Sequence, residues 1–256
     1  MRGFGIDATV PADIAQAVAV RAERDGYSSF WVNGSPPQGA LEIIERAAAN
    51  TELDLGIGVF PLTSISADEI VAEVRHRDLP QDRLWIGIGS SRSPGALAEV
   101  RQAVHTLRHE LEVRVVMAAV GPRMTVLAGE IADAVIFTWW TAEEVERSRV
   151  LLEQGAAAAG KHEPTVISFI RCALMPQAAE AVASRAEAYG KIPRYREVFE
   201  RAGITAEDTV VMGTSRAELL PGIEREEAAV DLSIIRAIPP SDTVEDLAEL
   251  AAACAP

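Results

Sequence analysis

The segment around Gly121 combines residue types that favour binding of an anion at the start of a helix. It follows an apolar run, and the small residues Ala119 and Gly121 would let an anion approach the backbone closely. Pro122 suits a first helical position, where backbone N–H groups can hold a phosphate, and Arg123 can add a charge-assisted hydrogen bond. The same residues also fit an ordinary connection between a strand and a helix, so both interpretations stay open.

Two glycine-containing segments are further candidates. The segment 87–94 places glycine, serine and arginine after an apolar run, and these residue types can bind an anion or a carbonyl group. Within it, Ser93 before Pro94 equally fits a helix N-cap. The segment 55–61 has glycines inside a strand-like run, which marks a bulge, a close backbone approach or a tightly packed corner. Neither segment has the spacing of a Walker or a dinucleotide-binding motif.

Several aromatic and charged residues also stand at the ends of apolar runs. Trp139 and Trp140 could stack on a ring or line an apolar pocket, although core or interface packing is the alternative. Arg171 and Arg236 could offset phosphate or an acidic tail, with surface ion pairing as the alternative. Asp7 fits either a polar site or a helix cap.

The elements that would position these residues alternate regularly along the chain. Short strand-like runs, most of them continuously apolar as expected of parallel strands covered on both faces, alternate with longer amphipathic runs. The strand-like runs are 3–6, 29–32, 53–59, 83–88, 113–119, 134–138, 166–173 and 230–235. Eight strand–helix units predict a (β/α)8 TIM barrel, with a doubly wound open sheet as the alternative.

The predicted barrel also determines the expected number of domains and the expected position of the substrate pocket. We expect one domain over 1–256, with short insertions and an extra helical segment over 192–222 that is broken at Pro221. Functional groups of such barrels lie at the carboxyl ends of the strands. The residues expected to line a substrate pocket there are Asp7, Phe60, Trp139 and Trp140. The segment 189–195 is predicted to be a surface loop that could cover the mouth.

Composition narrows the classes of function. The 256 residues carry 24 basic and 38 acidic side chains, a net charge of −14, which disfavours a nucleic-acid partner. No apolar run approaches the roughly 18 residues of a membrane span, and the start of the chain lacks a signal-peptide pattern, so a cytoplasmic protein is expected. Two cysteines without metal-ligand spacing predict neither a disulfide framework nor a metal site.

The sequence resembles the bacterial luciferase-like monooxygenases and their deazaflavin (coenzyme F420)-dependent relatives. The likeness includes the segments 26–32, 55–59 and 83–89. It is strongest over 118–133, which is similar to the family pattern A-A-x-G-P-x-M-x-x-L-A-G-x-x-A-D. Strand order and spacing agree along nearly the whole chain.

The resemblance implies a barrel that binds a flavin or deazaflavin. Backbone groups at 119–122 would hold the cofactor phosphate, and a non-prolyl cis peptide bond is implied at Gly58–Val59. The expected cofactor-binding residues are Gly58, Val59, Ser90, Ser91, Ala119, Val120, Gly121, Pro122 and Arg123.

The sequence departs from the family at its acid–base positions. Relatives that act on sugars or alcohols carry an acidic residue and a histidine after the second strand, where this chain has Gly34 and Ser35. Asn33 is the nearest polar side chain and is the one catalytic candidate. The four histidines are predicted to lie on the protein surface, away from the strand ends. They are His76, His105, His109 and His162.

These observations predict an oxidoreductase that uses F420, with FMN as the alternative cofactor, and a small apolar or conjugated substrate. A cofactor-binding protein of the same fold without catalysis is the second hypothesis. A phosphate-binding lyase or isomerase barrel without flavin is the third. The resemblance also implies a homodimer.

Overall fold

The computed structural model describes residues 1–90 and 94–256. Its strands are β1 (Arg2–Ile6), β2 (Ser29–Val32), β3 (Asp54–Pro61), β4 (Leu84–Gly89), β5 (Arg114–Ala118), β6 (Ala134–Thr138), β7 (Thr165–Leu174), β8 (Val210–Gly213) and β9 (Leu232–Ala237). Its helices are α1 (Ala12–Arg24), α2 (Pro37–Ala48), α3 (Ala67–His76), α4 (Ala96–Glu110), α5 (Pro122–Ile131), α6 (Ala142–Ala158), α7 (Ala179–Gly190), α8 (Pro193–Ala202), α9 (Arg216–Glu227) and α10 (Val244–Ala253). Short 3₁₀ turns precede β4 and β8.

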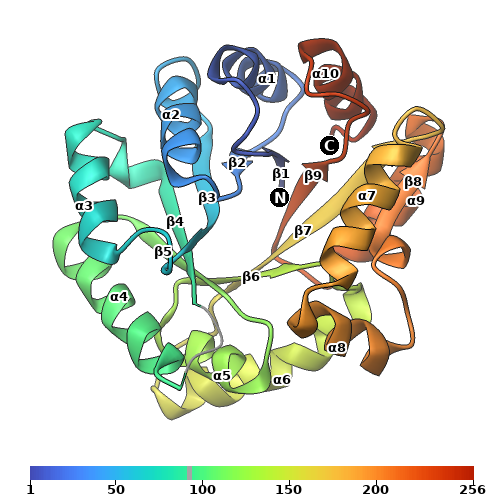
Figure 1. The fold of residues 1–256 in the computed structure, drawn as a ribbon. Helices are drawn as coiled ribbons and strands as arrows, with labels where there is room; N and C mark the ends of the chain where they lie inside the picture. The colour runs from blue at the N-terminus through green and yellow to red at the C-terminus, as the bar shows by residue number, and fades with distance from the viewer. Residues whose placement is uncertain (91–93) are drawn as a thin grey trace.

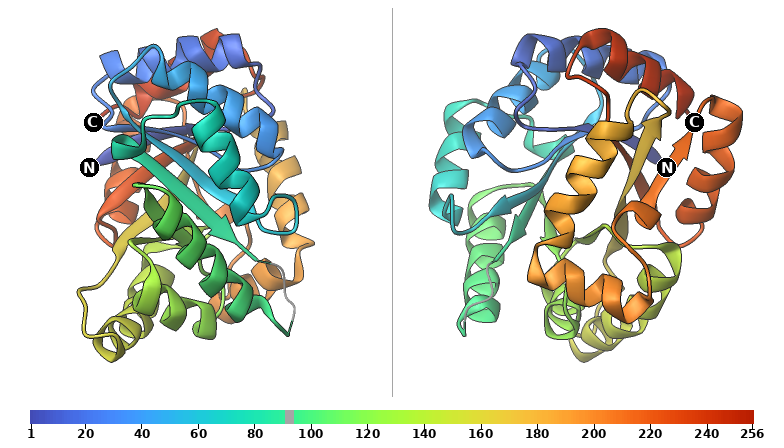
Figure 2. Two further views of the ribbon diagram at one scale, coloured as in Figure 1. Left: turned by 90° about the vertical axis from the view of Figure 1, so that its left-hand side faces the viewer. Right: turned by 45° about the vertical axis from the view of Figure 1, so that its right-hand side comes forward.

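The sheet closes into a barrel of eight parallel strands. Strands β1 to β6 pair in chain order, β9 pairs with β1 and β7, and β6 pairs with β7 to complete the ring. The helices surround this ring, and the chain termini lie side by side (Figures 1 and 2). Arg2 ties the two ends together, since its Nη1 donates to the carbonyl oxygens of Cys254 and Ala255 at 2.8 and 2.9 Å. The predicted (β/α)8 barrel is confirmed.

The segment 192–222 differs from the helical insertion expected for it. It contains α8 but also β8, and Pro221 lies inside α9 instead of ending a helix. Strand β8 pairs with the last residues of β7, where Arg171 also pairs with β9. Since β6 pairs with the earlier part of β7, β8 continues the same edge beyond the end of β6. The run Val210–Gly213 is short and apolar, and such a run cannot be separated from a buried helix segment by periodicity alone.

Aromatic side chains fill the inside of the barrel beneath its carboxyl end. Trp31 is fully buried, and its ring centroid lies 6.1 Å from that of Trp85 and 6.4 Å from that of Phe169. Strands β2 and β7 are not neighbours in the ring, so the Trp31–Phe169 contact crosses the interior. A Cβ atom at Gly56 would come within 2.2 Å of the Trp31 ring, which explains the glycine in this strand. The filled interior supports the residues above it.

Candidate active site

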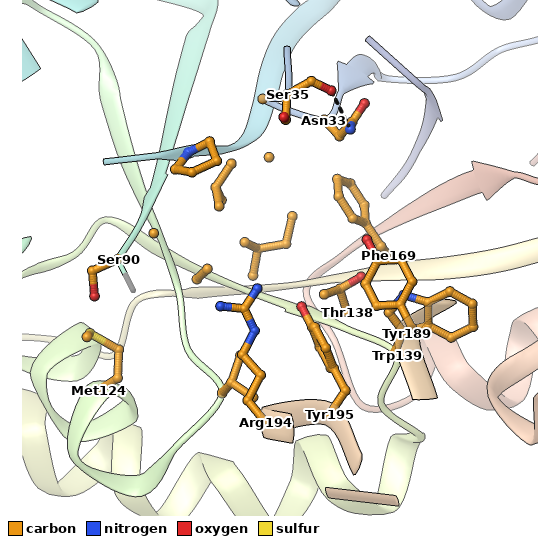
Figure 3. A pocket seen from close by; sticks show the side chains of 18 of the residues that line it. Asn33, Ser35, Ser90, Met124, Thr138, Trp139, Phe169, Tyr189, Arg194 and Tyr195 are labelled. Atoms are coloured by element: carbon orange, nitrogen blue, oxygen red, sulfur yellow. Dashed lines mark hydrogen bonds between the residues drawn. The ribbon is translucent and has the colours of Figure 1, made fainter. Parts of the chain in front are cut away.

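A pocket of about 720 Å³ opens at the carboxyl ends of the strands. Its volume falls in the range of roughly 300–1,000 Å³ that is usual for small-molecule sites. Residues in or directly after strands β1 to β6 line it, together with side chains from β7, β9, α7 and α8 (Figure 3). No helix among the described residues is long and apolar enough to cross a membrane. The same residues hold no cluster of histidine, cysteine and carboxylate side chains suited to a metal.

One side of the pocket is the start of α5. Val120, Gly121, Pro122 and Arg123 line it, and no side chain caps the helix. A Cβ atom at Gly121 would meet nothing within 4 Å, so the space in front of this helix start is open. An uncapped helix start beside a pocket is suited to an anion, because its backbone N–H groups and helix dipole both favour negative charge.

Strand β3 is approached at backbone distance by the loop after β2 and by β4. The Gly58–Val59 peptide bond is cis, as the resemblance implied. A Cβ atom at Gly34 would lie 2.3 Å from the carbonyl oxygen of Val59, and one at Gly87 would lie 2.3 Å from that of Ile57. The register of β3 against β4 shifts between Ile57 and Phe60. Of the interpretations that the sequence left open for the segment 55–61, the register shift indicates a bulge, and the glycines within it pack against side chains, Gly56 against Trp31 and Gly58 against Phe169.

The electrostatics of the pocket are opposite in sign to those of the whole chain. Among the described lining residues, Asp7 is the only carboxylate, and five are arginines. These are Arg123, Arg171, Arg185, Arg194 and Arg236. A pocket with this composition favours an anionic ligand in a protein of net charge −14.

Asp7 is held between two of these arginines. Arg236, from β9, donates to Oδ1 and Arg185, from α7, donates to Oδ2. Burial opposes ionisation of Asp7, but the charges and hydrogen bonds of Arg236 and Arg185 outweigh it, so the pKa of Asp7 lies below its ordinary value. The carboxylate neutralises part of the arginine charge and ties α7 to the barrel.

Arg171 is buried without a described carboxylate to balance its positive charge. It is 6% exposed, makes no ion pair with a described residue, and its Nη1 has no hydrogen-bond partner there. Its guanidinium carbon lies 3.8 Å from the centroid of the Trp139 ring and 5.3 Å from that of Tyr189. Burial lowers the pKa of Arg171 to about 10, which leaves it a cation at neutral pH. Surface ion pairing, the alternative for Arg171 and Arg236, is wrong because both side chains are buried.

Most of the buried polar side-chain atoms that lack a hydrogen-bond partner in the described part of the chain belong to residues that line the pocket. Five buried side-chain atoms find no hydrogen-bond partner among the described residues, and four of them belong to lining residues. They are Thr138 Oγ1, Trp139 Nε1, Arg171 Nη1 and Arg194 Nε. Because buried polar groups are nearly always satisfied in folded proteins, this concentration indicates a polar ligand or ordered water.

Asn33 lines the pocket, but its side-chain amide is already engaged. Its Oδ1 accepts a hydrogen bond from the Ala8 backbone N–H at 2.5 Å, and its Nδ2 donates to the Ser35 carbonyl oxygen at 3.1 Å (Figure 3). These bonds join the loops after β1 and β2. The arrangement favours a positioning role for Asn33 over the catalytic role expected from the sequence.

The remaining expected site residues divide into two groups. Gly58, Val59, Ser90 and Trp139 line the pocket with the residues already described. Phe60, Trp140 and Ala119 are buried and are not lining residues. Trp140 instead stacks on Phe137 with ring centroids 4.6 Å apart, because the two tryptophans point to opposite sides of the chain. Ser91 lies outside the described residues.

The sequence placed the segment 189–195 near the mouth of the barrel but did not identify the lining side chains that α7 and α8 supply. The segment 189–195 was expected to be a surface loop, but it ends α7 and begins α8, and Tyr195 is 5% exposed. Arg185 and Arg194 lie far along the chain from the strand ends they face. The available signal was on α7, where Arg185 and Tyr189 lie four residues apart on one face of the helix.

The Asp7 pair predicts a specific loss of stability in acid. Because the folded-state pKa of Asp7 is lowered, its ionised form stabilises the fold above the unfolded-state pKa of about 3.9, and this contribution disappears as the pH falls through the folded-state pKa. Urea unfolding between pH 3 and pH 7 measures it. The stability gap between the wild type and Asp7→Asn should be full above pH 5 and should narrow below about pH 4. A gap independent of pH would contradict the assignment.

The fold and pocket define a (β/α)8 barrel with an arginine-rich site at the carboxyl ends of its strands. The family model of the luciferase-like monooxygenases matches residues 83–253, which is more than half of the chain. The chain therefore belongs to the luciferase-like monooxygenase family, and the resemblance is confirmed. Comparison of the sequence with curated proteins finds no match.

Solved structures share this fold over nearly the whole chain. An F420-dependent secondary alcohol dehydrogenase in complex with an F420–acetone adduct has a TM-score of 0.74 and 16% identity, covering 98% of both chains. The coenzyme F420-dependent tetrahydromethanopterin reductase from Methanopyrus kandleri has a TM-score of 0.75 and 16% identity, covering 97% of both chains. The oxygenating constituent of the 3,6-diketocamphane monooxygenase of Pseudomonas putida, in complex with FMN, has a TM-score of 0.67 and 14% identity, covering 100% of this chain and 98% of that chain.

Proposed function

We propose that this chain is an oxidoreductase that uses coenzyme F420 in hydride transfer to or from a small organic substrate. The observation that carries the proposal is the pocket itself, with the uncapped, open start of α5 on one side and Gly58–Val59 lining it from β3. Membership of the luciferase-like family and the likeness to F420-dependent structures support it. FMN, bound in a related structure, is the alternative cofactor and would favour oxygenation.

The residues present fit a flavin-type cofactor. Backbone groups of Val120, Gly121 and Arg123 would hold its phosphate, and the unpartnered Thr138 Oγ1 and Trp139 Nε1 offer hydrogen bonds to a polar ligand. Bound in this pocket, the deazaflavin would supply the hydride chemistry. The role of the chain is to bind and orient the reactants.

The protein offers little acid–base chemistry of its own. Asp7 is kept ionised by Arg185 and Arg236, and none of the four exposed histidines is among the described lining residues. Solvent would therefore protonate the product. The same observation favours a second candidate, a cofactor-binding protein without catalysis.

Titration of the purified chain with F420 and, separately, with FMN tests the proposal. We expect quenching of cofactor fluorescence at micromolar protein, with F420 bound more tightly than FMN. Tighter binding of FMN would move the chemistry toward oxygenation. Binding without turnover of any alcohol, imine or enone offered would favour the non-catalytic candidate. If neither cofactor binds at tens of micromolar, the proposal fails.

A pair of variants at Gly121 tests where the cofactor phosphate binds. Gly121→Asp places a carboxylate at the start of α5, so cofactor affinity should fall by about tenfold or more, while the helix is stabilised by about 0.5 kcal/mol as an N-cap. Gly121→Asn has nearly the same shape without the charge and should bind nearly as the wild type does. Fluorescence titration and thermal unfolding measure the two effects. Equal affinities of the two variants would place the phosphate elsewhere.

The homodimer and the cytoplasmic location stay predictions. Sedimentation velocity of the purified chain would test the first, and cell fractionation the second.

A further inference from the structure

The pocket has a second region suited to negative charge, apart from the start of α5. Trp139 and Tyr189 lie on one side of the cavity and Met124, in the first turn of α5, lies on the other (Figure 3). Arg171 stacks on Trp139 and Tyr189, and the guanidinium of Arg194 extends into the space between the two sides (Figure 3). One phosphate at the start of α5 would therefore leave Arg171 uncompensated.

The local structure around Arg171 is built to hold an uncompensated charge inside the protein. Arg171 is buried and has no described carboxylate partner, a combination that is costly unless a ligand supplies the negative charge. Trp139, which covers its guanidinium, adopts a φ of 60°, a conformation that bulky residues rarely take. Asp7, the one described carboxylate in the pocket, is already bound by Arg185 and Arg236.

The surroundings of Arg171 also indicate the body of the ligand. Aromatic and aliphatic side chains line the cavity beside it, including Phe169, Tyr195 and Ile238. A guanidinium binds a planar carboxylate through two parallel hydrogen bonds, and its stacked rings restrict it to such in-plane contacts. The region thus suits an acid with an aromatic or conjugated body.

We propose that Arg171 and Arg194 form a subsite for the carboxylate of an aromatic or conjugated organic acid, which is the substrate class of this protein. Its role as a substrate rests on the proposed oxidoreductase function, whereas the carboxylate subsite rests on the buried Arg171 guanidinium and on the unpartnered Arg171 Nη1 and Arg194 Nε. The subsite revises the apolar substrate expected from the sequence by adding one anionic group.

Calorimetric titration with benzoate, benzamide and inorganic phosphate tests the subsite, first on the chain without cofactor and then with F420 or FMN bound. We expect benzoate to bind with a dissociation constant on the order of 1 mM, about tenfold or more tightly than its neutral analogue benzamide. Benzoate should still bind when the cofactor is present. Arg171→Met should lose this preference while its melting temperature stays level or rises, because a buried charge without a partner has been removed.

Two variants on α8 control the experiment. Arg194→Met should also weaken benzoate binding, which keeps the test independent of how Arg171→Met folds. Arg196→Met, on the same helix but exposed, should bind benzoate as the wild type does. Equal binding of benzoate and benzamide, no binding of benzoate in the millimolar range, or full retention of binding by both pocket variants would overturn the proposal.

The same titrations separate this inference from the proposed function. Exclusion of benzoate by a bound cofactor, or tighter binding of phosphate than of benzoate at Arg171, would assign the subsite to the cofactor and would also overturn the proposal. If benzoate binds through Arg171 but neither cofactor binds, the subsite stands and the oxidoreductase function fails. If a cofactor binds and benzoate does not, only the subsite fails.

Discussion

Gly155→Ala is expected to lower the free energy of unfolding by about 3 kcal/mol and the melting temperature by about 6–12 °C. Helices α5 and α6 cross where each has a glycine. A Cβ atom at Gly155 would lie 2.0 Å from the carbonyl oxygen of Val126, and one at Gly129 would lie 2.2 Å from that of Leu152. Backbone atoms cannot move aside as a flexible side chain can, so the two helices must separate.

The separation of α5 from α6 should also disturb the pocket. Helix α5 begins at Pro122, directly after the predicted phosphate-binding residues, so its displacement should weaken cofactor binding as well as stability. Gly190→Ala is the matched control, because it makes the same change at the end of α7, where a Cβ atom meets nothing within 4 Å. That variant should be neutral or slightly more stable, since alanine favours helix. Thermal and urea unfolding give the comparison, and equal stabilities of the two variants would refute close packing of α5 on α6.

Asp7→Asn is expected to cost about 3–5 kcal/mol of stability, the typical result of removing one partner from a buried ion pair. The variant keeps the shape of the side chain but leaves Arg236, which is 5% exposed, without a carboxylate among its described neighbours. Arg185 loses the bond that ties α7 to the barrel. Arg171 adds to the uncompensated positive charge in the same pocket.

The direction of the binding change distinguishes this loss from simple misfolding. With its only described carboxylate removed, the folded variant should bind benzoate more tightly than the wild type does, although it is less stable. Asp7→Asn/Arg236→Met should recover part of the stability, because it removes the stranded charge. Asp25→Asn, which breaks the exposed Arg21–Asp25 pair on α1, should cost under about 1 kcal/mol. A loss at Asp7 as small as the loss at Asp25 would show that the buried pair contributes little.

The parts of the fold that the sequence predicted have local causes. Most barrel strands are apolar runs, since they are covered on both faces, and several helices begin at a proline, as α2, α5 and α8 do. The glycines at 56 and 58 also indicated an irregular strand, and the structure has a register shift there, with Trp31 and Phe169 packed against the two glycines. Strand β8 was not predicted, because its four residues form a strand only through their pairing with the end of β7.

For the site, too, the features that were predicted from the sequence have local causes, and the features that were not predicted depend on the fold. The start of α5 could be found from the sequence, because a proline, a glycine and an arginine stand next to one another after a strand. Asn33 and Asp7 were placed at the pocket, but their partners could not be read from the chain. Phe60 and Trp140 were assigned to the pocket because they follow strands, yet side chains alternate across the backbone and these two point into the core.

By itself, the sequence predicted the barrel, the family and a helix start suited to an anion, because these depend on residue patterns along the chain. Only the tertiary structure decided that Arg171 and Arg236 are buried and that α7 and α8 complete the pocket. It also decided that Asp7 forms ion pairs with Arg185 and Arg236. These groups are separated by as many as 229 positions along the chain. Burial and charge compensation depend on distance in space, so they are set only when the barrel has closed and α7 and α8 have packed over its mouth.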